Sequence, residues 1–127
     1  MTGTPRVLVV EDEVLIRMLA VDMLADQGFA PDEAGTAAEA LAKLQEPGAN
    51  YAMIFLDIGL PDKRGDDLIN EVRKFQPALP LLVASGEDIA DLRSRLQHHH
   101  PIGFLGKPYD STRLEQAIDA LRQASAV

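Results

Sequence analysis

Ala52-Met53-Ile54-Phe55-Leu56-Asp57 is the stretch that decides the fold, because five apolar residues run straight into a carboxylate. The apolar run shows no alternation with polar residues, which is typical of a strand buried on both faces of a parallel sheet. The same pattern recurs in three shorter runs, Val7–Val10, Leu81–Ala84 and Ile102–Leu105. These four runs predict a parallel sheet that helices cover on both faces.

Segments with helical spacing of apolar residues separate the predicted strands. They are marked by Ile16, Leu19, Ala20, Met23 and Leu24, by Ala37, Ala40, Leu41 and Leu44, by Leu68, Val72 and Phe75, by Ile89, Leu92 and Leu96, and by Leu114, Ala117, Ile118 and Leu121. Two pairs, Thr36 with Glu39 and Thr112 with Glu115, have the spacing of capping boxes at helix starts.

Ala30–Ala34 is the remaining strand candidate, and Pro31 within it cannot donate to a ladder, so we expect it at an edge of the sheet. The chain then alternates strand and helix five times. This alternation predicts an α/β, doubly wound sheet with right-handed crossovers.

Length and composition narrow the class of protein. The chain has 127 residues, which favours one domain over 1–127, and it has no cysteine, which excludes disulfides and thiolate chemistry. Its net charge of -8 argues against nucleic-acid binding. No apolar run reaches the ~20 residues that span a bilayer, and the first residues show no export signal. We therefore expect a cytoplasmic protein without membrane contact.

Polar residues stand where the predicted strands end. Glu11-Asp12-Glu13 follows the first strand, Asp57 the third, Ser85 the fourth and Lys107-Pro108 the fifth. Each acid alone fits a helix cap or a solvated loop, but together they meet at the rim where doubly wound sheets bind ligands. A cluster of carboxylates needs a cation, and oxygen ligands favour Mg²⁺.

The order of these motifs resembles the receiver domain of two-component response regulators. The motifs are Val9-Val10-Glu11-Asp12-Glu13, Leu56-Asp57-Ile58-Gly59-Leu60-Pro61, Ala84-Ser85-Gly86 and Lys107-Pro108-Tyr109-Asp110. The resemblance covers the chain from about residue 6 to 121. It implies a flavodoxin-like sheet of five parallel strands in the order 2-1-3-4-5, flanked by five helices.

The resemblance also implies a role for each strand-end residue. Asp57 would accept the phosphoryl group, and Mg²⁺ would be held by Glu11, Asp12, Asp57 and the backbone carbonyl of Gly59. Lys107 would pair with a phosphoryl oxygen, Ser85 would donate its hydroxyl to that group, and the Lys107–Pro108 bond would be cis.

Phe104 has two interpretations. The resemblance makes it a switch aromatic that moves together with Ser85, whereas its apolar surroundings alone are typical of buried core on a central strand. Lys63 and Arg64 depart from the family pattern, either as contacts to the phosphoryl donor or as solvated loop residues. Glu87 holds a position that tunes hydrolysis of the phosphoaspartate in the family.

His98-His99-His100 is interpreted as a solvated helix end, because three adjacent residues cannot all face one metal ion.

A receiver of this kind is expected to take its phosphoryl group from a sensor histidine kinase or a histidine phosphotransfer protein. It would signal to a downstream protein through the face formed by the fourth helix, fifth strand and fifth helix, as a monomer or weak dimer. It would not be an enzyme beyond self-phosphorylation and autodephosphorylation.

Three alternatives stay open: a receiver detached from a hybrid kinase or longer regulator, a binding scaffold, and a small Mg²⁺-dependent phosphohydrolase. Such hydrolases carry a second acid two residues after the nucleophile, where this chain has Gly59.

Overall fold

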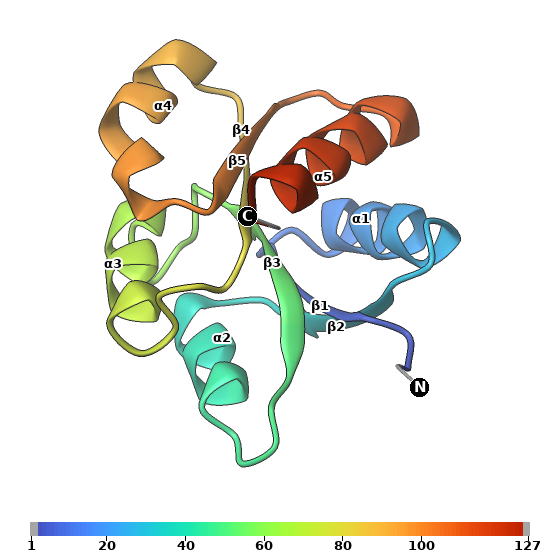
Figure 1. Cartoon of the computed structure of the whole chain (residues 1–127), viewed down its shortest axis with the longest axis vertical. Helices are drawn as coiled ribbons and strands as arrows, with labels where there is room; N and C mark the ends of the chain where they lie inside the picture. The colour runs from blue at the N-terminus through green and yellow to red at the C-terminus, as the bar shows by residue number, and fades with distance from the viewer. Residues whose placement is uncertain (1–2, 126–127) are drawn as a thin grey trace.

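Five parallel strands form one sheet in the order β2-β1-β3-β4-β5 (Figure 1). The computed structural model describes residues 3–125. The strands are β1 (Arg6–Val10), β2 (Ala30–Ala34), β3 (Tyr51–Asp57), β4 (Leu81–Ser85) and β5 (Ile102–Gly106). The order is the predicted one, and β2 lies at an edge, as its proline indicates.

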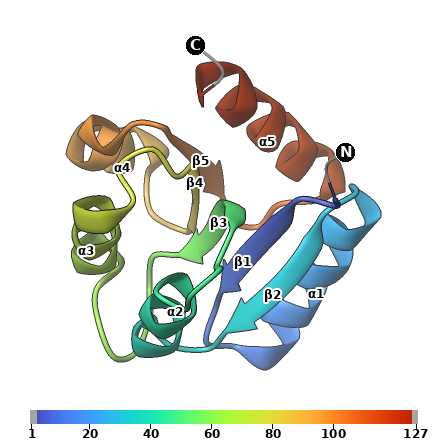
Figure 2. The ribbon, with the colours of Figure 1, turned by 60° about the horizontal axis from the view of Figure 1, so that its bottom comes forward.

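Helices cover both faces of the sheet (Figure 2). One face carries α1 (Val14–Asp26) and α5 (Ser111–Ser125), and the other carries α2 (Ala37–Leu44), α3 (Gly65–Phe75) and α4 (Ile89–Leu96). A short 3₁₀ turn, Gln97–His99, follows α4 and holds most of the histidine run, with His98 and His100 exposed as expected for a helix end. Within residues 3–125, no helix is both long and apolar enough to cross a membrane.

The strand periodicity divides the core into two layers. Along β1, Leu8 and Val10 face α2, α3 and α4, whereas Val7 and Val9 face α1 and α5, and all four are buried. Because successive side chains alternate across a strand, an apolar run supplies both layers at once. Each fully buried side chain of this size contributes about 1.5–3 kcal/mol to folding.

Helix caps follow the predicted boxes at one helix and depart from them at another. Thr36 accepts from the N–H of Glu39 at 3.1 Å, as expected, although the Glu39 carboxylate accepts from Gly35 instead of Thr36. The prediction for Thr112 was wrong. At α5 the cap is Asp110, whose carboxylate accepts from the N–H of Arg113 at 2.9 Å, because the helix begins at Ser111, two residues before the start that a cap at Thr112 requires.

Two helix side chains expected in the core are exposed, and the run of β5 is less buried than its pattern indicated. Leu19 of α1 is 58% exposed and Phe75 of α3 is 38% exposed. The β5 run is half-buried over most of its length, because β5 is the other edge of the sheet. Phe104 lies on this edge strand, so its alternative interpretation as core of a central strand was wrong.

Candidate functional site

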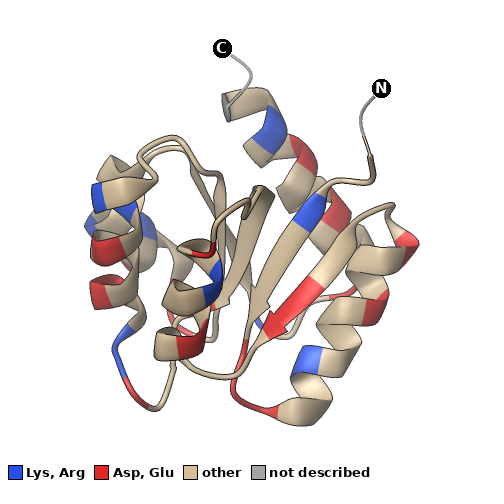
Figure 3. Ribbon diagram, turned by 90° about the horizontal axis from the view of Figure 1, so that it is seen from below, with Lys and Arg blue, Asp and Glu red and all other residues tan. Residues whose placement is uncertain are grey.

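Three carboxylates meet at the carboxyl ends of β1 and β3. Glu11 and Asp12 follow β1, Asp57 ends β3, and one oxygen from each lies within 4.8 Å of the others. Glu11 is buried, Asp57 is half-buried and Asp12 is exposed. Figure 3 shows acidic residues, in red, along the loop that leads from β1 into α1. The sequence prediction that these strand ends converge is confirmed.

Lys107 neutralises part of this charge. Its ammonium donates to Oδ2 of Asp57 at 2.9 Å and lies 3.6 Å from Oε1 of Glu11. The other oxygen of Asp57, Oδ1, accepts from the backbone N–H of Gly59 at 3.1 Å. The Lys107–Pro108 bond is cis, as the resemblance implied, and a second cis bond, His100–Pro101, had no sequence prediction. The Asp57 carboxylate is therefore oriented through both of its oxygens.

The two neighbouring acids ionise very differently. Burial and, secondarily, the hydrogen bond to Asp57 together raise the pKa of Glu11 to about 7. Burial also acts to raise the pKa of Asp57, but hydrogen bonds from Glu11 and Lys107 outweigh it and hold that pKa below its ordinary value. Pairing with Asp57 raises the pKa of Lys107 despite its partial burial. Asp57 is thus kept as a carboxylate, which is the form that can act as a nucleophile.

The donor set fits a hard divalent cation. All three close groups offer carboxylate oxygens, and among residues 3–125 they are the group of acids and histidines whose geometry suits a metal. The excess of negative charge over the single ammonium of Lys107 would be offset by such an ion. Mg²⁺ satisfies both the chemistry and the charge.

Ser85 ends β4 beside this cluster. It is 1% exposed, and its Oγ accepts from the backbone N–H of Glu87 at 2.9 Å. The Glu87 carboxylate is directed to α4, where it lies 3.6 Å from Arg95. Arg95 also donates to Asp66 of α3 at 2.5 Å. The hydroxyl expected to meet a phosphoryl group is therefore held by its own loop.

Phe104 lies on β5 opposite Val83 of β4, two residues before Ser85. Its half-buried ring packs against the core layer of α3 and α4, and the guanidinium of Arg93 lies 5.5 Å from the ring centroid. The ring thus has one apolar side and one side that faces a surface arginine of α4.

The loop from β3 to α3 is fixed by contacts that the sequence did not indicate. Both carboxylate oxygens of Asp62 accept from the first N–H groups of α2, at Ala37 (2.9 Å) and Ala38 (3.0 Å). These bonds lower the pKa of Asp62. Lys63 pairs with Glu71 of α3, which favours a structural role over contact with a donor. Arg64 remains 74% exposed.

A hollow of about 420 Å³ opens beside Lys107, between α1 and the loop that follows β5. Its lining residues are Ile16, Leu19, Met23, Lys107, Pro108 and Tyr109. The surface of α1 next to it is apolar, because Val14, Leu15, Met18 and Leu19 are each more than half exposed. An apolar patch of this kind on a small domain is typical of a protein-binding site.

Comparison with known proteins gives a consistent result. A family model described as the response regulator receiver domain matches residues 7–119. The transcriptional regulatory protein PmrA of Pectobacterium parmentieri is 34% identical over 116 residues, which cover 91% of this chain and 51% of that protein. The sensor kinase CckA of Brucella abortus is 30% identical over 118 residues, which cover 93% of this chain and 12% of the kinase. The chain thus spans about half of one relative and a small part of the other.

Solved structures share the architecture. NtrX from Brucella abortus superimposes with a TM-score of 0.84 at 31% identity, over 98% of this chain and 28% of that chain. The chemotaxis protein CheY4 of Vibrio cholerae superimposes with a TM-score of 0.81 at 26% identity, over 94% of this chain and 99% of that one. The similarity to CheY4 extends over nearly the whole of both chains.

Proposed function

The chain belongs to the response regulator receiver family of two-component signalling, and on that premise we propose that Asp57 is its phosphoryl acceptor. Receiver domains are phosphorylated by histidine kinases and are not a catalytic enzyme family in themselves. The observation that carries the proposal is the pairing of Asp57 with Lys107 at 2.9 Å inside a carboxylate cluster. The lysine keeps Asp57 ionised and leaves a cation where a phosphoryl oxygen would arrive.

In the proposed reaction an Asp57 oxygen attacks the phosphorus of a phosphohistidine. The O–P bond forms as the P–N bond breaks, and the imidazole leaves with the bonding electrons and takes up a proton. Glu11, Asp12, Asp57 and the carbonyl of Gly59 would hold Mg²⁺, which supplies charge neutralisation at the phosphoryl oxygens. Lys107 would hold one phosphoryl oxygen. Hydrolysis of the acyl phosphate by water would reset the domain, so autodephosphorylation is part of the proposal.

The output step would use Ser85 and Phe104. A phosphoryl group on Asp57 would draw the Ser85 hydroxyl away from the N–H of Glu87, which it now accepts at 2.9 Å. Release of that N–H would free the loop into α4 and change the packing around Phe104, against which Arg93 lies. The face of α4, β5 and α5 would then meet a downstream protein, with the receiver a monomer or weak dimer in the cytoplasm.

The apolar surface of α1 supports a donor site. A sensor histidine kinase or histidine phosphotransfer protein would cover Leu15 and Met18 while its histidine reaches Asp57 past the hollow beside Lys107. Leu15→Arg should reduce labelling by a protein donor at least tenfold and leave labelling by acetyl phosphate unchanged. An equal loss with both donors would contradict this docking site.

Intact mass measurement tests the central proposal. The chain is mixed with acetyl phosphate and Mg²⁺ and weighed, with Asp57→Asn as the variant and Asp67→Asn, an exposed acid of α3, as the matched control. We expect one phosphoryl group on the wild type and the control and none on Asp57→Asn. Release of inorganic phosphate without a labelled intermediate would favour a phosphohydrolase. No reaction at all would favour a binding scaffold.

A further inference from the structure

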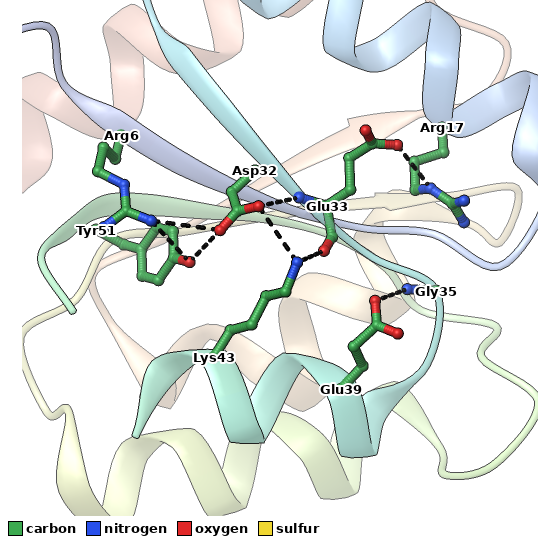
Figure 4. Close-up of polar contacts among 8 residues, drawn as sticks. All are labelled: Arg6, Arg17, Asp32, Glu33, Gly35, Glu39, Lys43 and Tyr51. Carbon is green, nitrogen blue, oxygen red and sulfur yellow. Dashed lines mark hydrogen bonds and ion pairs between the residues drawn. The ribbon is translucent and has the colours of Figure 1, made fainter. Parts of the chain in front are cut away.

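Arg17 connects α1 to the turn that carries the first two acids of the site. It stands in the first turn of α1, and its side chain is 18% exposed. Nη1 donates to the backbone carbonyl of Glu11 at 2.8 Å. Figure 4 shows the other contact, in which Nε donates to Oε1 of Glu33 on β2 at 3.0 Å. One guanidinium therefore bridges the end of β1 and the edge strand.

The bond to Glu11 completes the support of that residue. The N–H of Glu11 donates to the carbonyl of Ala34, the last residue of β2, at 3.0 Å. Its carbonyl is taken by Arg17, so the peptide groups on both sides of the Glu11 side chain are fixed. An unpaired carbonyl at this buried position would cost stability and leave the turn free to move.

Glu33 is itself held in place. Its backbone N–H donates to Asp32 at 2.9 Å, and its carbonyl accepts from Lys43 of α2. Asp32 in turn accepts from the hydroxyl of Tyr51 on β3 at 2.6 Å. Figure 4 shows these side chains meeting across β2. The carboxylate that orients Arg17 thus stands on a strand fastened to its neighbours.

Gly35 leaves the space that the guanidinium occupies. A Cβ built at Gly35 would lie 3.2 Å from Nη1 of Arg17, closer than ordinary van der Waals contact. The N–H of Gly35 donates to Glu39 at 3.1 Å, which fixes this backbone against α2. A methyl group at position 35 would therefore press on the nitrogen that donates to the Glu11 carbonyl, which must shift by a few tenths of an ångström.

We infer that Arg17 is a positioning residue for the metal site: through the Glu11 carbonyl it holds the turn that presents Glu11 and Asp12. The inference rests on the Mg²⁺ site proposed above. The charge of Arg17 and its role as a support predict opposite effects of its removal on Mg²⁺ affinity. As a mere nearby cation, Arg17 repels Mg²⁺, so its removal would tighten binding. As a support for the ligands, its removal would weaken binding.

Calorimetric titration with MgCl₂ separates these two roles. We expect Arg17→Met to raise the Kd for Mg²⁺ at least fivefold. Arg17→Lys, which keeps the charge but cannot make both directed bonds, should fall between Arg17→Met and the wild type. Lys74→Met removes the same charge from the last turn of α3 and should leave the Kd within twofold. An unchanged or lower Kd in Arg17→Met would overturn the inference.

Gly35→Ala tests the same role with every charge and every ligand in place. It should raise the Kd in the direction of Arg17→Met, and it decides the question if Arg17→Met does not fold by circular dichroism. An unchanged Kd in folded Gly35→Ala, together with a normal Kd in Arg17→Lys, would contradict the inference. Absence of Mg²⁺ binding by the wild type would instead refute the metal site itself.

Discussion

The ammonium of Lys107 reaches Oδ2 of Asp57 at 2.9 Å, and this contact joins the loop after β5 to the end of β3 across the intervening strand β4. The two residues are fifty positions apart in the chain. The contact depends on the parallel arrangement, which brings both strand ends to one rim. Lys107 would have two opposing effects at this position, because its positive charge would bind a phosphoryl oxygen and would also repel a metal ion.

Lys107→Met should change Mg²⁺ affinity and the rate of phosphoryl transfer in opposite directions. Loss of a cation near the cluster should strengthen Mg²⁺ binding by roughly 1 kcal/mol, or about fivefold. Labelling by acetyl phosphate should slow by roughly tenfold or more, because a charged contact to the phosphoryl group, worth about 1.5–3 kcal/mol, is lost. Calorimetry and intact mass measure the two effects, and Lys107→Arg serves as the charge-preserving control. Weaker Mg²⁺ binding in Lys107→Met would contradict this account.

Glu11 should make the metal-free domain less stable as pH rises. Its pKa is raised to about 7 in the folded chain from an unfolded value of 4.5, so folding favours its protonated form. The resulting stability is present below pH 4.5 and is lost as pH rises toward 7. The lowered pKa of Asp57 acts at more acidic pH, outside this window.

Urea unfolding of the wild type and Glu11→Gln at pH 5 and pH 7.5 measures this effect. Because glutamine cannot ionise, only the wild type loses this stability. The free energy of unfolding of Glu11→Gln minus that of the wild type should therefore rise by roughly 2 kcal/mol from pH 5 to pH 7.5. Saturating Mg²⁺ should reduce the difference by stabilising the ionised wild type. A constant difference across this range would refute the raised pKa.

Gly65→Ala should disturb the loop between Asp57 and α3, at the point where α3 begins. A Cβ there would lie 2.5 Å from the side chain of Ile58 and 2.7 Å from its carbonyl oxygen, so the loop or α3 must move. We expect a loss of about 1–3 kcal/mol in the free energy of unfolding, together with weaker Mg²⁺ binding because Gly59 shifts. Gly86→Ala is the control, since nothing lies within 4 Å of its added Cβ. Equal stability of the two variants would contradict the prediction.

Arg73 should contribute strongly to the free energy of unfolding. Its guanidinium donates to four backbone carbonyls, those of Gln76, Leu79, His99 and Pro101, at 2.7–2.9 Å. Arg73→Met would remove these four hydrogen bonds and should cost roughly 2–3 kcal/mol. Lysine should not rescue it, because a single ammonium cannot reach all four. Chemical unfolding beside Lys74→Met, an exposed neighbour, checks the value, and similar midpoints would refute it.

The residue pattern was sufficient to predict the alternation of strands and helices and the cluster of acids, and the strand order followed from the family resemblance. The side chains that support the site could not be predicted in either way. Asp57, Ser85 and Lys107 stand directly after apolar runs, so the rule for parallel sheets brings them together without further information. Arg17 binds the backbone carbonyl of Glu11 and Arg73 binds those of His99 and Pro101, and no side-chain pattern encodes a carbonyl partner.

The exposed side of α1 illustrates a different limit. Apolar residues continue around this helix, so periodicity alone could not show that Leu19 faces solvent while Ala20 and Leu24 face the core. The cap of α5 shows a third limit, because Asp110 and Thr112 are both good cap residues and the apolar spacing does not say which of them precedes the first turn.

The proline and the ion pairs of β2 also determine where the sheet stops. A strand from a second copy of the chain could not pair fully with β2, because Pro31 has no N–H to donate. That strand would also cover Asp32, which is already paired with Arg6 and Lys43. Edge strands with these features resist strand-by-strand aggregation. The same contacts that fasten α2 to the sheet therefore keep the sheet from growing into a fibre.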